Sequence, residues 1–72
     1  MDITRAELER YIDQYIFSEL YRAVLKRRML DGVKFEPLAE EFDLSVRHTK
    51  RIVYLSTEIL FRNIPKPDNL IV

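Results

Sequence analysis

Three cationic side chains stand at helical spacing in the middle of the chain, with no acidic residue among them. Arg47, Lys50 and Arg51 lie within Ser45 to Tyr54, a stretch without aspartate or glutamate. Residues three and four apart share one face of a helix. Guanidinium and ammonium groups bind phosphate oxygens, and arginine also donates two parallel hydrogen bonds to a guanine edge. This pattern favours nucleic-acid binding over its alternative, an ordinary solvated helix face.

The apolar residues around these cations predict two short helices joined by a turn. Leu38, Ala39 and Phe42 share one face of a helix expected from about 37 to 42, and Thr49 and Ile52 share one face of a second, from about 46 to 62. The polar side of the second helix is then left pointing outward. A helix-turn-helix, here expected over about 36–62, presents its recognition helix to the DNA major groove in this way.

The residues of the turn fit the same interpretation. Pro37 suits a first helical position, where its missing N–H leaves no acceptor unsatisfied. Asp43 stands where the chain leaves the first helix, and aspartate tolerates the left-handed conformation better than most residues. Ser45 is a favourable N-cap for the second helix.

The run from Val24 to Ile52 resembles region four of bacterial sigma factors and the small phage and mobile-element regulators that share its helix-turn-helix. Two positions depart from that pattern: Asp43 replaces the usual glycine of the turn, and Thr49 replaces an aliphatic residue, so its hydroxyl needs a partner such as its own helix backbone. The matching features are Val24-Leu25, Arg28, Asp31-Gly32, Leu38-Ala39-Glu40-Glu41, Leu44-Ser45 and the basic helix that follows.

The expected function is DNA-binding transcription regulation, with recognition by the first half of the second helix. The expected base-contacting residues are Val46, Arg47, Lys50 and Arg51. The expected phosphate-contacting residues are Lys26, Arg27, Arg28, Ser45 and Tyr54. For the cluster at residues 26–28 the alternative is a complement to the negative end of its own helix. For Tyr54 the alternative is packing against the core.

A second expected function is that of a protein-interaction module. Region four of sigma factors also contacts RNA polymerase, so the resemblance implies, as an alternative, a module that binds RNA polymerase or another transcription protein. The acidic first half of the chain and the apolar end Leu70-Ile71-Val72 agree with this alternative. Because one helix-turn-helix buries a modest area, we also expect a homodimer or larger assembly. We expect no enzyme, no cofactor and no metal site, since no nucleophile has a plausible His–acid partnership.

Composition sets the expected architecture and location. The chain has 72 residues, enough for one domain, which we expect over residues 1–64, followed by an extended tail over 65–72 because of Pro65 and Pro67. It has no cysteine, no signal-peptide pattern and no apolar run of transmembrane length. A cytoplasmic protein without membrane contact is expected. Its twelve acids and twelve bases are unevenly placed: ten of the acids precede Leu44, whereas the second half is basic.

The first half of the chain predicts two further helices, and thus an all-α bundle of about four. Thr4 and Glu7 form a capping-box pattern at the start of the first helix. Apolar residues continue at helical spacing, and we expect a break near Ser18, since so short a chain must fold back to build a core. Gly32 is expected as the C′ residue that ends the second helix.

Overall fold

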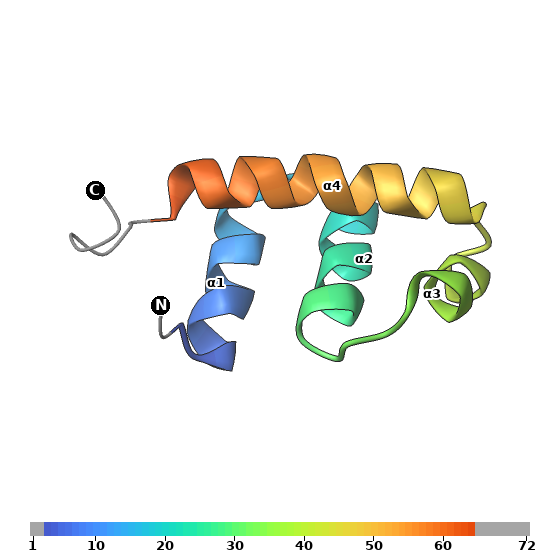
Figure 1. The fold of residues 1–72 in the computed structure, drawn as a ribbon. Coiled ribbons are helices and arrows are strands. Elements are labelled where there is room, and N and C mark those ends of the chain that lie inside the picture. Colours follow the sequence, from blue (N-terminus) through green and yellow to red (C-terminus); the bar gives the residue numbers. More distant parts are fainter. Residues whose placement is uncertain (1–2, 65–72) are drawn as a thin grey trace, which may run out of the picture.

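Four helices form the part of the chain that the structure, a computed structural model, describes: residues 3–64. They are α1 (Arg5–Tyr15), α2 (Glu19–Met29), α3 (Phe35–Glu41) and α4 (Val46–Asn63) (Figure 1). The predicted all-α bundle is confirmed for these residues. The tail predicted over residues 65–72 lies outside the described residues. None of the described helices has both the length and the apolar character that a membrane crossing needs.

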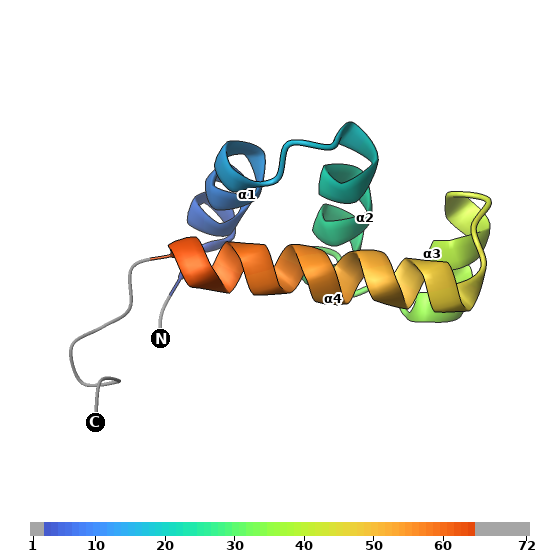
Figure 2. The same cartoon turned by 90° about the horizontal axis from the view of Figure 1, so that it is seen from above.

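The longest helix, α4, lies crosswise over α1 and α2, which stand side by side, while α3 lies beside its N-terminal end (Figures 1 and 2). The inner side of α4 contributes to the core at intervals from Thr49 to Leu60. Its outer side is left uncovered by the other three helices. The buried apolar residues come from all four helices and the positions that flank them: Ile12, Ile16, Val24, Leu25, Leu38, Ala39, Ile52, Val53, Leu60 and Ile64.

Side-chain caps begin three of the helices. The hydroxyl of Thr4 accepts a hydrogen bond from the backbone N–H of Glu7 at 3.1 Å, and the Glu7 carboxylate accepts one in return from the Thr4 N–H, which completes the predicted capping box. Ser18 caps α2 through the N–H of Tyr21. The predicted break near Ser18 is therefore confirmed, because a capped helix start stops α1 from continuing.

The start of α3 differs from the prediction. The helix begins at Phe35 rather than at Pro37, and it ends at Glu41 with Phe42 as its C-cap. Pro37 is thus the third helical residue. The first-turn N–H groups of a helix have no acceptor within it, so proline costs no hydrogen bond there either. Lys34 is the N-cap residue, and its side chain cannot accept a hydrogen bond, which removed the usual sequence signal for the start.

The second helix ends slightly before the predicted position. Its C-cap is Leu30, so Gly32 lies two residues beyond the cap, one later than predicted. Gly32 has a φ of 68°, the left-handed conformation that glycine adopts without strain. The N–H of Val33 then donates to the carbonyl of Arg27 at 3.2 Å and closes the turn that leads into α3.

A network of ion pairs links α1, α2 and α3. The Arg27 guanidinium donates to both carboxylate oxygens of Glu41, with Nε at 2.8 Å from Oε2, and to Asp31 at 2.9 Å. Arg5 donates to Asp31 at 2.8 Å. Hydrogen bonds from Arg5 and Arg27 lower the pKa of Asp31 below its ordinary 3.8, and the hydrogen bond from Arg27 lowers the pKa of Glu41 below its ordinary 4.5.

This network predicts a loss of stability in acid. A carboxyl group whose pKa is lower in the folded state adds stability above its unfolded pKa and loses it as the pH falls through the folded pKa. We therefore expect the melting temperature to drop as the pH falls below about 4.5. Arg27→Ala should lower the melting temperature near neutral pH and make its fall in acid shallower. Thermal unfolding followed by circular dichroism against pH measures both effects.

The matched control is Arg62→Ala, which breaks the exposed pair between Arg62 and Glu58 within α4. Exposed pairs one helical turn apart contribute little, so the melting temperature should change less than with Arg27→Ala. An equal acid profile in wild type and Arg27→Ala would show that the network does not carry the pH dependence.

Two hydroxyls are fully buried on the inner side of α4, and they differ in their partners. The Thr49 hydroxyl donates to the Ser45 carbonyl at 2.9 Å, which confirms the helix-backbone partner expected for it. The Ser56 hydroxyl has no hydrogen-bond partner among the described residues. A buried hydroxyl without a partner loses its hydrogen bonds to water on folding.

Ser56→Ala should therefore stabilise the protein by about 1 kcal/mol, since the buried unpaired hydroxyl is removed and alanine favours helix. Urea unfolding at equilibrium measures the change. Thr49→Ala is the contrasting variant: it removes a paired hydroxyl and a buried methyl group, and it should destabilise by about 1 to 2 kcal/mol. Destabilisation by Ser56→Ala would contradict the prediction.

Candidate nucleic-acid interface

The first turn of α4 is fixed by its N-cap. The Ser45 hydroxyl accepts from the N–H of His48 at 3.0 Å, as predicted for an N-cap serine. Just before it, Asp43 has a φ of 55°, so the left-handed conformation predicted for this residue is confirmed. The N–H of Leu44 donates to the Ala39 carbonyl at 2.8 Å and ties the turn to the end of α3. This turn sets the direction in which the residues after Ser45 project.

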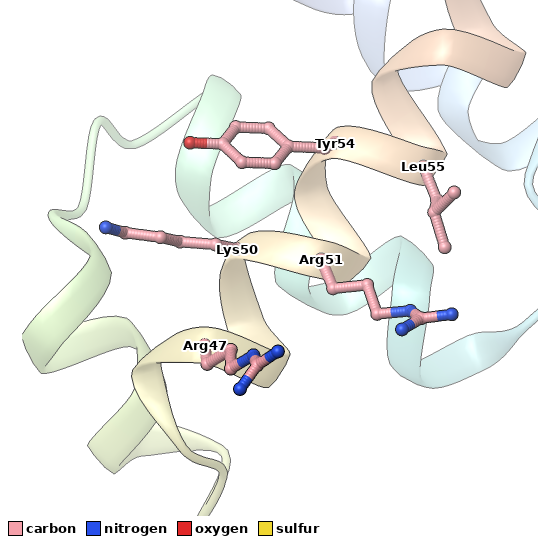
Figure 3. A pocket seen from close by; sticks show the side chains of 5 residues that line it. All are labelled: Arg47, Lys50, Arg51, Tyr54 and Leu55. Carbon is pink, nitrogen blue, oxygen red and sulfur yellow. The ribbon is translucent and has the colours of Figure 1, made fainter.

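The predicted base-contacting cations lie on the exposed side of α4. Arg47, Lys50 and Arg51 are all exposed, and in Figure 3 they project outward from the first half of the helix. With Tyr54 and Leu55 they line a shallow hollow of about 500 Å³. Lys50 and Tyr54 point to one side of the helix, whereas Arg51 and Leu55 point to the other. The outward position predicted for these cations is thus confirmed.

The aromatic ring of Phe35, at the start of α3, holds one side of this surface. The Lys50 ammonium lies 5.6 Å from the ring centroid, and the Tyr54 ring meets it edge-on at 6.2 Å between centroids. The Arg28 guanidinium lies over the same ring at 4.3 Å. A cation over an aromatic face is attracted by the negative charge of that face. Phe35 therefore orients Lys50 and Tyr54, a role that the sequence did not reveal.

The sequence left two alternatives for Tyr54, phosphate contact and packing against the core, and its position in the structure has features of both. Its side chain is 61% exposed, so it is not part of the core, yet its ring contacts Phe35 rather than projecting alone. The phenol group can reach a ligand without leaving that contact. A phosphate-contacting role for Tyr54 stays a prediction.

A second hollow of about 440 Å³ lies where α3 meets the start of α4. Val46, predicted to contact bases, is half-buried in its wall. Lys34 and Lys50 stand at the same hollow, so two cations from different elements flank it. Lys34 was not among the predicted site residues, because its place beside α4 depends on the packing of α3. Its full lining is Lys34, Phe35, Glu36, Pro37, Val46 and Lys50.

The third hollow, of about 360 Å³, lies at the N-terminal end of α4. Ser45, Arg47, His48 and Arg51 line it. His48 is exposed on this side of the helix. Ser45, predicted to contact phosphate, is exposed here while its hydroxyl caps the helix.

The cluster at residues 26–28, predicted to contact phosphate, is not free in the structure, because each of its side chains has a partner among the described residues. Lys26 pairs with Asp13 at 2.7 Å. Arg27 pairs with Glu41 and Asp31, as described above. Arg28 donates to the Val33 carbonyl at 3.1 Å. Phosphate contact by this cluster stays a prediction, and it requires these side chains to share or exchange their present partners.

The cations at the start of α4 differ from those that join the other helices by ion pairs. Within residues 3–64, Arg47, Lys50 and Arg51 form no ion pair, whereas Arg5, Lys26 and Arg27 each do. Unpaired cations on one helix face create a local positive potential even when the net charge is zero. In the same part of the chain no group of three acidic, histidine or cysteine side chains could hold a metal ion.

The three cations of this surface can donate hydrogen bonds to acceptor oxygens and nitrogens. The phenol of Tyr54, the hydroxyl of Ser45 and the imidazole of His48 lie next to them. Comparisons of the chain with protein-family models, with curated proteins and with solved structures found no match. The properties of the surface thus follow from its own residues.

The N-cap at Ser45 gives a prediction about the stability of the protein. Ser45→Ala should destabilise the protein by about 1 kcal/mol, because the His48 N–H loses its acceptor. Ser45→Asp should keep most of the stability, since aspartate also caps helices and complements the helix dipole. Urea unfolding measures both. Equal stability of wild type and Ser45→Ala would contradict the role of this cap.

Proposed function

We propose that this protein binds double-stranded DNA and regulates transcription, with the first half of α4 in the major groove. The observation that carries the proposal is the set of three exposed cations without acidic partners within residues 3–64, on a helix that the rest of the bundle supports from behind. The short connection between α3 and α4, with its left-handed Asp43, supports the proposal, because a helix-turn-helix joins its two helices by a turn of about three or four residues.

The side chains have distinct proposed roles. Arg47 and Arg51 donate in pairs to guanine O6 and N7, while Lys50 reaches base or phosphate acceptors. The methyl groups of Val46 contact a thymine methyl. Ser45 and Tyr54 bind phosphates and fix the position of α4 on the duplex.

We add Lys34 to the phosphate-binding residues. It is exposed and stands beside Lys50 at the hollow between α3 and α4. On DNA of random sequence, where Arg47 and Arg51 meet no fixed guanine, these two arginines together with Lys34 and Lys50 give four cations that can neutralise phosphates. The Lys26 to Arg28 cluster supports the protein fold in the free molecule, so it is a weaker candidate for the same role.

The alternative function, contact with RNA polymerase, has less support. It relied on the apolar end at residues 70–72, which lies outside the described residues, and on the acidic first half of the chain. Several of those acids pair with cations of the same chain: Asp13 with Lys26, Asp31 with Arg5 and Arg27, and Glu41 with Arg27. An acidic surface already neutralised in this way offers less to a basic partner. Polymerase contact stays a prediction from the sequence resemblance.

DNA binding is tested by its salt dependence and by removal of the exposed cations. If about four phosphates are neutralised, the logarithm of the binding constant should fall with the logarithm of salt concentration at a slope near −3.6. The double variant Arg47→Ala with Lys50→Ala should bind more weakly and show a slope near −1.8, since about half of the contacts are lost. Fluorescence anisotropy of a labelled duplex pool of random sequence measures both slopes.

The matched control is Arg10→Ala, which removes an exposed cation of α1. Its slope should equal that of wild type. Ser45→Asp provides a second check, because it keeps the helix cap but places a negative charge in the proposed interface, so binding should weaken without a matching loss of stability. Wild-type protein that does not bind the duplex, or binding unaffected by the double variant, would overturn the proposal.

A further inference from the structure

The second half of α4 exposes an apolar stripe that the bundle does not cover. Leu55 and Ile59 are 42% and 41% exposed, and they lie one helical turn apart. The charged residues Glu58 and Arg62 lie on the same side of α4 and border this apolar pair. The four residues together follow the spacing i, i+3, i+4 and i+7 of one helix side. Exposed apolar side chains that are grouped and bordered by charges mark contact surfaces between proteins.

The charges of this stripe are complementary to themselves. The Arg62 guanidinium donates to the Glu58 carboxylate at 2.8 Å, and both side chains are more than half exposed. If two copies of the stripe meet antiparallel, with the two-fold axis at the level of residue 60, Glu58 of each copy faces Arg62 of the other. A two-fold contact requires this kind of self-complementary surface, since both copies use the same residues.

We propose that this stripe, formed by Leu55, Glu58, Ile59 and Arg62, binds a second copy of this chain through an antiparallel contact between the two α4 helices. Ile59 lies one residue from the axis and meets its counterpart there, so it supplies most of the buried area, whereas Leu55 lies near the end of the partner's α4. The ion pairs across the axis set the register and the direction of the partner helix, because exposed charges contribute more to specificity than to affinity.

The spacing of the resulting dimer agrees with the proposed function, on which this step rests. Residue 49, the centre of the cations at residues 47–51, is eleven residues from residue 60, and a helix rises about 1.5 Å per residue. The two cationic surfaces of the dimer would therefore lie about 33 Å apart along antiparallel helices. Successive major grooves on one side of B-DNA are about 34 Å apart, the half-site spacing of helix-turn-helix dimers.

The stripe predicts weak self-association. From Leu55 to Arg62 it covers about 11 Å of helix. Stable interfaces usually bury about 800 Å² on each partner, which one helix side of this length does not supply. We expect the monomer to predominate in dilute solution and the dimer to form at high concentration or on a duplex that carries two half-sites.

The test is sedimentation equilibrium of the full chain in the absence of DNA, from micromolar to near-millimolar concentration at low salt. The mean mass of wild type should rise from 8.7 kDa toward twice that value. Glu58→Arg and Arg62→Glu should each abolish the rise, because all four facing charges then have the same sign. An equimolar mixture of the two variants should restore it, because every facing pair is again opposite.

Recovery in the mixture separates a two-fold contact from general charge effects. The matched control is Glu9→Arg, the same change at an exposed acid of α1, and it should associate as wild type does. Circular dichroism establishes that each variant is folded. A wild-type mass that stays at 8.7 kDa throughout, or a mixture that stays monomeric, overturns the inference. DNA binding by a strictly monomeric chain would overturn this inference alone and leave the proposed function in place.

Discussion

The burial of one side of α4 is the constraint on which the rest of the structure depends. Thr49, Ile52, Val53, Ser56 and Leu60 place this side in the core, so every other helix packs against the same element. A helix fixed in this manner cannot rotate without exposing its apolar side, which would cost roughly 0.8 kcal/mol for each CH₂ group returned to water. The outer side of α4 consequently has a defined direction along its whole length.

The distribution of charge complements this arrangement. Three cations of α1 and α2 pair with acids of α1, α3 and the α2–α3 turn: Arg5, Lys26 and Arg27. The cations at the start of α4 lack such partners within residues 3–64. The chain can thus have equal numbers of acids and bases and still present a positive surface, because pairing is concentrated among the supporting helices.

Local sequence rules predicted the features whose causes lie within a few residues. The caps at Thr4 and Ser45 and the left-handed Asp43 belong to this group, as does the outward position of the α4 cations. Features that depend on packing between distant residues could not be predicted. Arg27 meets Glu41 fourteen positions away, so a residue expected to contact phosphate instead joins two helices. The predicted start of α3 was wrong because the N-cap residue Lys34 gives no capping signal in the sequence.

The position of Phe35 has a consequence for the short helix α3. A single ring at its first residue contacts Arg28 of α2 and both Lys50 and Tyr54 of α4. Any tilt of α3 relative to α4 must therefore reorient two surface side chains together. The position of α3 therefore also sets the directions of the hydrogen-bond donors on the outer side of α4. Changes buried beneath α3 could in this way alter what the outer surface recognises while leaving every residue of that surface unchanged.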